Sequence, residues 1–258
     1  MTRPPFEPVE GVEGAFVWTP GERALRVEVD ADAPPPESTP EIDAAWDAMR
    51  RSNPRLHDAV FLSAIAIDAD AGAIRCVPDR YRRLATLGAD GIDTPEPTPV
   101  LTSVIGLLVA TDEAGEPHTL IGRRAADTRL FGGQWESAPA GGLDPDLASE
   151  EHTLSAAHLL EQIRRELTEE TGLTLHMPVL ESRTVCVVWT PEARSYDIAV
   201  LVVPSERIEA IHPAEHARSW EYDDVQWLPL GGIKSFDRVH GPEMTPQLRV
   251  VWRVMGWV

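Results

Sequence analysis

The sequence predicts an α/β or α+β protein whose mixed β-sheet carries an inserted helix. Three observations lead to this prediction. Apolar runs rich in Val, Ile and Leu recur along the chain, and turn residues separate them, which is typical of strands. A stretch in the second half has apolar residues three and four positions apart, which is typical of an amphipathic helix. The 258 residues allow one large domain, or a core domain with a smaller one.

Residues 1–98 are predicted to form an N-terminal α+β extension. Thr39-Pro40, followed by acidic residues, indicates the start of a helix, and Asn53-Pro54 indicates its end. The proline-rich residues 31–40 form a linker, and residues 90–99 mark the boundary of this part. The expected elements, in order, are two strands within 14–30 joined by a turn at 19–22, a helix within 40–53, and strands near 59–68 and 73–79.

Residues 99–258 are predicted to hold the main domain. It opens with a strongly apolar strand and its hairpin partner, and a helix then interrupts the series of strands. A helix among strands indicates a core that mixes both kinds of element. The expected elements, in order, are strands 100–112 and 118–125 with a turn at 113–115, a helix between the glycines at 141–142 and position 179, strands 179–190, 196–204 and 224–230, and a helix within 245–258.

The composition favours a soluble protein that handles small molecules or divalent cations. The formal net charge of −19 and the pI near 4.7 disfavour nucleic acid bound by a general basic surface. The two cysteines, Cys76 and Cys186, show no pairing pattern and fit a reducing compartment. The N-terminus lacks a signal-peptide pattern, and no apolar run approaches the roughly 18 residues that span a membrane. We therefore expect a cytoplasmic protein with no membrane contact.

The stretch LSAAHLLEQIRRELTEETGL is the strongest helix candidate. Its apolar residues at 156, 159, 160, 163 and 167 form one buried face. Thr153 is a plausible N-cap, and Gly172 stands where a left-handed C-cap is needed. The helical spacing places three carboxylates, those of Glu166, Glu169 and Glu170, on one face near the C-terminal end.

Two readings of these glutamates remain open at this point. Like charges at these spacings repel, and anions are disfavoured at a helix C-terminus, so the cluster is either a solvated acidic face or a cation site. Mg²⁺ and Mn²⁺ prefer oxygen ligands. The glycine-rich segment 131–144 precedes the helix, and its backbone can approach a metal or ligand closely. Arg123 and Arg124 end the preceding hairpin, where they can meet phosphate oxygens.

The nine residues RELTEETGL match the second half of the Nudix box, GX5EX7REUXEEXGU, at all seven specified positions. The surroundings resemble the Nudix family as well, with an apolar strand, a hairpin partner ending in Arg-Arg and a Trp-containing loop before PAGG. The resemblance covers roughly residues 100–235. It implies a Nudix fold, in which helices sandwich a mixed β-sheet, and a pyrophosphohydrolase that uses Mg²⁺ or Mn²⁺.

The resemblance also implies roles for individual residues. Glu169 and Glu170 would bind the metal, Glu166 would bind metal or act as the base that deprotonates the attacking water, and Arg165 would orient Glu166 through a salt bridge. The metal shell would be completed by a backbone carbonyl of Gly141 or Gly142, with Glu215 and Glu221 as further candidates from loops outside the box. For substrate binding the candidates are Arg123, Arg124 and Trp135.

The first half of the box departs from the family pattern. The family places its glycine 14 residues before the arginine, whereas Gly142 lies 23 before Arg165, so about nine residues within DPDLASEEHTL are inserted. Ala157 stands where the family has its first glutamate. Glu150, Glu151 and Glu161 are the alternatives for that role, and Glu161 is spaced to pair with Arg165. We expect activity without the first glutamate, because it is generally not the main metal ligand in the family.

The implied substrate is a small nucleoside diphosphate derivative, and the box does not identify the attached group. The segment from the helix near 45–52 through Asn-Pro-Arg-Leu at 53–56 resembles a module of the UDP-glucose pyrophosphatase branch, as does Tyr81-Arg82-Arg83. That similarity raises hydrolysis of UDP-sugars to UMP and a sugar 1-phosphate. The alternative is a catalytically weak Nudix domain that senses a nucleotide ligand. The resemblance also raises a homodimer, while the nucleobase, the metal and the oligomeric state stay open.

Overall fold

The computed structural model describes eight segments of the chain: residues 5–20, 24–30, 32–89, 91–93, 96–148, 152–175, 178–211 and 220–258. The turn expected at 19–22 extends beyond these ranges, and Glu150, Glu151 and Glu215 lie outside them.

Strand β6 (Leu101–Thr111) is at the centre of the fold and belongs to two sheets. From Leu101 to Leu108 it pairs in parallel with β12 (Ser195–Pro204). Its last three residues pair in antiparallel fashion with β7 (Pro117–Arg124), which begins a second, smaller sheet. A single strand therefore connects the two halves of the core.

The larger sheet runs in the order β1-β2-β11-β12-β6-β4-β5-β3-β10, and β9 also pairs with β6. The smaller sheet joins β13, β7 and β8 to the end of β6. Every strand predicted from the sequence is present in one of these sheets. The bounds not yet given are β1 (Glu7–Pro8), β2 (Phe16–Trp18), β3 (Arg26–Val29), β4 (Val60–Asp68), β5 (Ala73–Arg80), β8 (Trp135–Ser137), β9 (Ala140–Gly142), β10 (Thr153–Leu154), β11 (Val179–Thr190) and β13 (Tyr222–Pro229).

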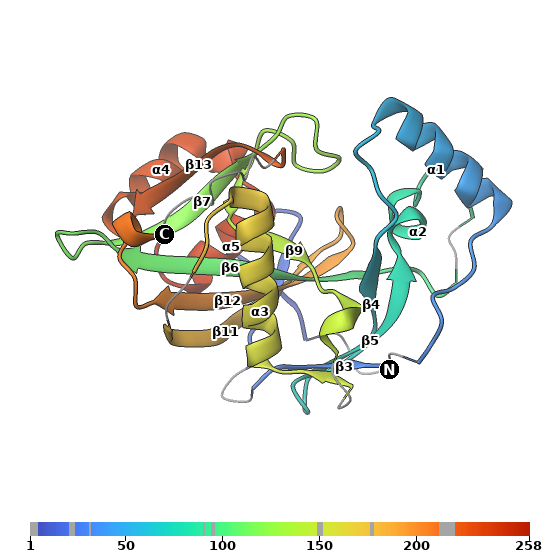
Figure 1. The fold of residues 1–258 in the computed structure, drawn as a ribbon, viewed down its shortest axis with the longest axis horizontal. Helices are drawn as coiled ribbons and strands as arrows, with labels where there is room; N and C mark the ends of the chain where they lie inside the picture. Colours follow the sequence, from blue (N-terminus) through green and yellow to red (C-terminus); the bar gives the residue numbers. More distant parts are fainter. Residues whose placement is uncertain are drawn as a thin grey trace.

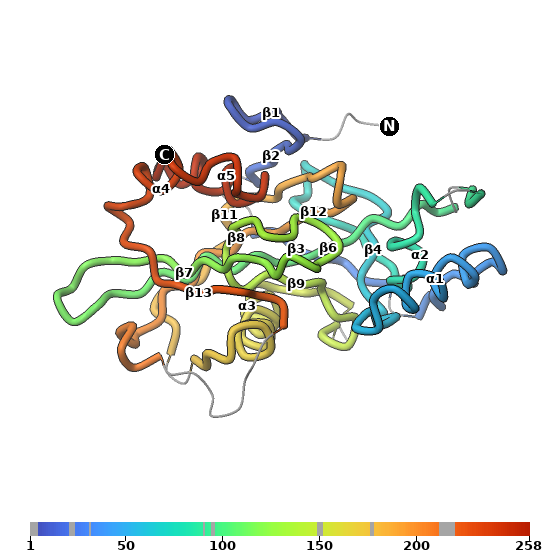
Figure 2. The backbone as a smooth tube through the Cα atoms, turned by 90° about the horizontal axis from the view of Figure 1, so that it is seen from above, coloured from blue at the N-terminus to red at the C-terminus, as the bar shows by residue number. Residues whose placement is uncertain are grey.

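Helices cover both faces of the larger sheet (Figures 1 and 2). Helix α3 (Ala156–Glu166) packs on one face through Leu159 and Ile163, which lie in the main apolar cluster with residues of β6 and β12. Helix α5 (Pro246–Val254) packs on the other face through Val250 and Val251. Successive side chains of a strand point to opposite faces of the sheet, so the same strands contribute apolar residues to both clusters. The predicted α+β class, with helices on both faces of a mixed sheet, is confirmed.

The N-terminal residues are built into the same sheet as the rest of the chain. Strand β2 pairs with β11 at one side, and β4 pairs with β6 at the other through Ser63 and Leu101. The backbone N–H of Val100 donates to the Ser63 hydroxyl at 3.0 Å, and the N–H of Ala64 donates to the Val100 carbonyl at 2.8 Å. Residues 1–98 and 99–258 therefore share one sheet. Helix α1 (Pro40–Ser52) begins at the predicted start, and Thr39 is its N-cap.

The insertion in the box forms its own contacts with the N-terminal extension. Strand β10 lies within the stretched segment and pairs with β3, so that Thr153 faces Glu28 and Leu154 faces Val27. Leu154 is fully buried. The unusual spacing of the box thus provides a strand that closes the edge of the sheet. This pairing corrects the predicted N-cap, because Thr153 is in a strand and Ser155 caps α3 together with the ring of His158, whose Nδ1 accepts from the Ser155 N–H at 3.0 Å.

Two helices appear where the sequence pattern indicated none. Helix α4 (Ile233–His240) lies in the segment expected to be a loop before the C-terminal helix. The short helix α2 (Tyr81–Ala85) follows β5 and contains Arg83, which forms a buried ion pair with Asp79 at 2.6 Å. Among the described helices, none has the length and apolar character needed to cross a membrane.

Candidate active site

The acidic end of α3 leads into a short π-helical turn. The α-helix ends at Glu166, the turn η2 covers Leu167–Thr171, and Gly172 caps it with a φ of 71°. π-turns inside helices occur often at functional sites. The predicted left-handed C-cap is confirmed. The widened turn changes the angular spacing after Glu166, so that Glu170 is buried while Glu169 is exposed.

The carboxylate of Glu166 is held against strand β9. A Cβ atom on Gly141 would overlap the Glu166 carboxyl group, so only glycine leaves room for it there. Gln162 lies one helical turn earlier and donates from Nε2 to Glu166 Oε1 at 2.6 Å. The pKa of Glu166 is raised to about 7, mainly by burial and also by the nearby charge of Glu169, while the Gln162 hydrogen bond lowers it in part.

The carboxylate of Glu170 meets the same strand one residue earlier. Its Oε2 accepts from the Ala140 backbone N–H at 2.9 Å and lies 3.3 Å from the Tyr222 hydroxyl. Its side chain is buried, and burial is the main reason that its pKa is raised well above the ordinary value of 4.5. The charges of Glu166 and Glu221 act in the same direction. Two carboxylates from one helix end therefore converge on β9.

A third carboxylate, that of Glu136, was not predicted as a site residue. It comes from β8 and accepts from Arg124 Nη1 at 2.6 Å and from the Tyr222 hydroxyl at 2.9 Å. The Tyr222 hydroxyl thus stands between Glu136 and Glu170. Burial raises the pKa of Glu136, while the charge of Arg124 lowers it in part. The sequence signal was weak, because Glu136 is a single acidic residue whose partners lie far along the chain.

The predicted salt bridge between Arg165 and Glu166 is wrong. The Arg165 guanidinium lies 3.7 Å from Glu161 and 3.9 Å from Asp144, on the exposed side of the helix. Adjacent helical residues point about 100° apart, whereas residues four apart share a face, so Gln162 takes the orienting position instead. The predicted pairing of Glu161 with Arg165 is confirmed.

The other predicted substrate-binding residues separate into two groups. Arg124 faces the glutamates, whereas the exposed Arg123 hydrogen-bonds the Gly133 carbonyl at 3.0 Å on the other side of the strand. Trp135 is 6% exposed and packs edge-on against Phe236, with ring centroids 5.4 Å apart. The expected stacking of Trp135 on a substrate is therefore replaced by packing in the core.

A cavity of about 230 Å³ lies beside the glutamates. Glu136, Arg124, Gly141 and Gly142 border one side of it, and its other walls come from β6, β12, the start of α5 and the loop after β7. Gly142 stands opposite Ser103 in the pairing of β9 with β6. Glu136 lines the cavity directly. Glu166 and Glu170 do not line it, but they contact Gly141 and Ala140, which do.

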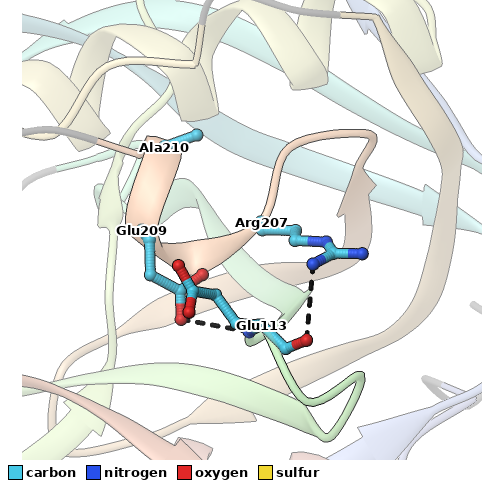
Figure 3. A pocket seen from close by; sticks show the side chains of 4 residues that line it. All are labelled: Glu113, Arg207, Glu209 and Ala210. Atoms are coloured by element: carbon cyan, nitrogen blue, oxygen red, sulfur yellow. Dashed lines mark hydrogen bonds between the residues drawn. The ribbon is translucent and has the colours of Figure 1, made fainter.

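A second hollow lies away from the box. Figure 3 shows its lining residues from the β6–β7 turn and the short helix η3 (Ile208–Ala210). Its polar groups already pair with each other: the Glu113 N–H donates to Glu209 at 3.1 Å, and Arg207 donates to the Glu113 carbonyl at 3.3 Å. Because its lining contains none of the glutamates described above, this hollow is not the candidate active site.

Comparison with known proteins places this geometry in a family. The family model described as the NUDIX domain matches residues 101–248, more than half of the chain. The chain belongs to the Nudix family. Membership of this family supports the predicted Nudix-type pyrophosphohydrolase. The match begins at β6 and includes the inserted segment, so the stretched box lies inside the Nudix domain.

Solved structures of Nudix proteins are similar to this chain at low sequence identity. The MutT protein from Methanosarcina mazei Go1 is 22% identical, over 60% of this chain and 91% of that chain, with a TM-score of 0.40. The Nudix domain of Shewanella oneidensis NrtR, complexed with ADP ribose, is 20% identical over 58% and 88% of the two chains, with a TM-score of 0.37. A bifunctional NMN adenylyltransferase/ADP ribose pyrophosphatase from Francisella tularensis is 19% identical over 67% and 44%, with a TM-score of 0.43. No curated protein matches the chain.

Nudix hydrolases generally use divalent metals, and the residues at the end of α3 fit such an ion. Burial is the main reason that the pKa values of Glu166 and Glu170 are raised, and negative neighbours add to it: Glu169 acts on Glu166, and Glu166 acts on Glu170. A cation beside them would offset the effect of these negative charges. In the part of the chain that the structure describes, no three His, Cys, Asp or Glu side chains are already arranged as a metal site. The fit therefore rests on the partly buried Glu166 carboxylate, the buried Glu170 carboxylate and the room that Gly141 leaves.

The raised pKa of Glu166 predicts how the stability of the metal-free protein depends on pH. The ordinary pKa of Glu166 is 4.5, and its folded value is about 7. The folded state therefore keeps a proton that the unfolded chain releases, so stability is lost as pH rises from about 4.5 to about 7. In EDTA, E166Q is expected to have a higher Tm than the parent near about pH 8 and a similar Tm near about pH 5. Equal pH dependence of Tm in E166Q and the parent would contradict this assignment, and E161Q, which alters an exposed glutamate, is the control.

The loop after β7 is expected to contribute modestly to substrate binding. Leu130 and Phe131 of this loop line the cavity, and Arg129 donates to the Tyr81 hydroxyl of the N-terminal extension at 3.0 Å. Exposed polar contacts are worth at most about 1 kcal/mol, so R129M is expected to raise KM by about two- to fivefold with little change in kcat. R183M, which removes another exposed arginine paired with Glu181, should leave KM unchanged. An R129M enzyme with the parent KM would show that this contact does not position the loop.

Proposed function

We propose that this Nudix protein hydrolyses a nucleoside diphosphate linked to a second group in a reaction that depends on Mg²⁺ or Mn²⁺. One observation carries the proposal: Glu166 and Glu170 approach neighbouring residues of β9, one in the space left by Gly141 and the other on the Ala140 N–H. This arrangement places carboxylate oxygens beside a glycine-rich strand that also borders the cavity.

Each residue has a role in the proposal. Glu166, Glu169 and Glu170 would hold the cation, with a backbone carbonyl of Gly141 or Gly142. When bound, the cation would screen phosphate charge and lower the pKa of water. Glu166 is placed to accept the proton of the attacking water, and Gln162 keeps its carboxylate oriented at 2.6 Å.

The buried polar groups beyond the box support the binding of phosphate. Arg124 faces the cavity and is held by Glu136 at 2.6 Å, so its guanidinium is oriented before a substrate arrives. Guanidinium groups bind phosphate oxygens well because their donors form a planar fork. Tyr222 fixes Glu136 and Glu170 relative to each other through one hydroxyl.

UDP-sugars are the first substrates to test. The Asn-Pro-Arg-Leu segment resembles the UDP-glucose pyrophosphatase branch, and it contacts the loop that borders the cavity: Arg55 pairs with Asp127 at 2.9 Å.

A cytoplasmic location is part of the proposal and is supported by Cys76 and Cys186, which are both buried and free. A homodimer stays a prediction.

The experiment is a hydrolysis screen of the full chain in Mg²⁺, in Mn²⁺ and in EDTA. The compounds are UDP-glucose, ADP-glucose, GDP-glucose, ADP-ribose, NADH, CoA, capped RNA and oxidised nucleotides. E169Q serves as the blank for a contaminating hydrolase. Turnover in ¹⁸O-water identifies which phosphorus is attacked, because the label stays on the phosphate that received the water.

The screen also separates the two readings of the domain. Cation-dependent turnover of at least one compound, absent in EDTA and in E169Q, is expected. Tight binding of a nucleotide without turnover of any diphosphate would overturn the hydrolase proposal in favour of a ligand sensor. Turnover that persists in EDTA would overturn its metal dependence.

A further inference from the structure

A buried carboxylate, unrelated to the Nudix box, lies at the cavity. Asp197 comes from β12 and is 6% exposed. It stands directly opposite Ser103 in the parallel pairing of β12 with β6, and both residues line the cavity. Their side chains face α5, away from α3 and the glutamates at its end. The reaction proposed above gives Asp197 no role.

The neighbours of Asp197 all present donors to it. The hydroxyl of Ser103 donates to Oδ1. Oδ2 accepts from the hydroxyls of Ser195 at 2.8 Å and Thr190 at 3.5 Å, and from Gln247 Nε2 at 3.4 Å. Burial raises the pKa of Asp197, and these hydrogen bonds lower it in part because they favour the charged form. An ionised carboxylate accepts only, so the hydroxyls of Ser103 and Ser195 use their protons on Asp197 and present oxygen lone pairs to the cavity.

Two other polar atoms at the cavity have no partner among the described residues. They are Gln247 Oε1 and the hydroxyl oxygen of Ser137, whose residue is 2% exposed. A buried polar atom without a hydrogen bond costs about 1–3 kcal/mol, so native proteins usually provide a partner for it. Here that partner would come from a molecule in the cavity. Gln247 Oε1 can only accept, whereas the Ser137 hydroxyl can accept or donate. With the serine oxygens beside Asp197, they make the floor of the cavity rich in acceptors.

The rest of the cavity suits a flat ring. Leu101, Ile105, Leu130, Phe131 and Leu248 contribute apolar walls. Its volume of about 230 Å³ is smaller than the roughly 300–1,000 Å³ of pockets for drug-sized ligands, so it suits one part of a substrate rather than the whole. Arg124 and Gly141 border the cavity, so a base held on its floor can leave its phosphates beside these two residues.

We propose that the cavity is a nucleobase site and that Asp197, with Gln247 and Ser137, selects bases whose edge carries N–H donors in an exocyclic amino group. Adenine, guanine and cytosine carry such a group, whereas uracil presents carbonyl oxygens on both sides of its single N–H. Carbonyl oxygens that face the lone pairs of Ser103, Ser195 and Gln247 Oε1 are unfavourable. This inference rests on the proposed function and revises its nucleobase: the preferred substrate has an amino-bearing base and not uracil.

The first test compares substrates that differ only in the base. With ADP-glucose, GDP-glucose and UDP-glucose, the sugar, the diphosphate and the metal are the same. We expect kcat/KM for one of the amino-bearing compounds to exceed that for UDP-glucose by about 10-fold or more, as sites built around hydrogen bonds discriminate strongly. Equal rates, or a preference for UDP-glucose, would overturn the inference.

The second test changes the polarity of the site. D197N keeps the shape of the side chain and replaces one acceptor oxygen with an N–H₂ donor. We expect the preference over UDP-glucose to shrink by about 10-fold or to reverse, because an amide donates to a carbonyl oxygen of uracil. A purely structural role for Asp197 predicts an equal loss of kcat/KM for all three substrates, and that result would overturn the inference.

A third variant, S137A, tests the site even if D197N does not fold. S137A removes an unpaired buried hydroxyl, so the Tm should stay unchanged or rise, while KM for the preferred substrate should rise by about threefold or more. An unchanged KM in S137A together with unaltered preference in D197N counts against the site.

Binding separates failure of this inference from failure of the proposed reaction. Should no diphosphate be hydrolysed, the dissociation constants of AMP, GMP, CMP and UMP are measured by calorimetry with the parent chain and D197N. Preferential binding of an amino-bearing nucleotide that D197N removes supports the inference in the absence of catalysis. Binding of none of the four overturns it.

Discussion

E166Q is expected to lower kcat by about 10²–10⁴-fold, the range for removal of a general base. Glutamine has the same shape as glutamate and can still receive the Gln162 hydrogen bond, which is 2.6 Å long in the parent. It cannot accept a proton from water, and its neutral oxygen binds a divalent cation weakly. The fold should persist, because the change removes a charge whose burial raises its pKa to about 7. Steady-state kinetics at saturating Mg²⁺, with Tm as a fold control, measures the effect.

E161Q is the matched control for this variant. Glu161 belongs to the same helix, is exposed and pairs with Arg165 at 3.7 Å, so its loss removes a surface charge and leaves the buried carboxylates in place. Its kcat should lie within about twofold of the parent. Full metal-dependent turnover in both E166Q and E169Q would show that the reaction takes place elsewhere.

Much of the fold could be predicted from local patterns. Strand β11 covers Val179–Thr190, the same residues that the apolar run indicated, and α1 begins at the predicted start. These elements are long, and their side-chain alternation or capping residues are local. Strand β10 has two residues and exists because it pairs with β3, more than a hundred positions earlier. No local pattern indicates such a strand.

The active site was predictable only where its residues are neighbours in sequence. Glu166, Glu169 and Glu170 follow one motif, and the structure brings Glu166 and Glu170 to the same strand. Glu136 and Tyr222 are 86 positions apart, so the hydrogen bond between them depends on the pairing of β13, β7 and β8. The cavity floor is non-local too, because Asp197 meets Ser103 from 94 positions away.

The predicted role of Arg165 failed for a different reason. Arg165 and Glu166 are adjacent in sequence, and a salt bridge between them satisfies charge but not helical geometry. Asp144, at the start of the inserted segment, lies 3.9 Å from Arg165. The insertion thus changes the surroundings of the arginine as well as the spacing of the box. We therefore expect R165A to alter the surface of the helix near Asp144 and not the orientation of Glu166.

G141A is expected to lower kcat by about 10²-fold or more, because a misplacement of about 1 Å at a reacting group can have that effect. The added methyl group would overlap the Glu166 carboxyl group, which must then leave β9. The backbone of Gly141 does not have a positive φ, so alanine is strained there by this contact and not by its own conformation. The variant keeps every charge of the site and changes only where the Glu166 carboxylate lies.

G142A provides the matched comparison one residue later. A Cβ at Gly142 would meet Leu101 Cδ1 at 3.4 Å, an ordinary van der Waals distance, and the backbone carbonyl is retained. Its kcat should therefore remain close to that of the parent. The two variants add the same methyl group to adjacent residues of one strand, so a general weakening of β9 would affect both. A loss of kcat in G141A but not in G142A would show that the reaction needs the Glu166 carboxylate in its place against β9. Full activity in G141A would show that the reaction does not need the carboxylate there.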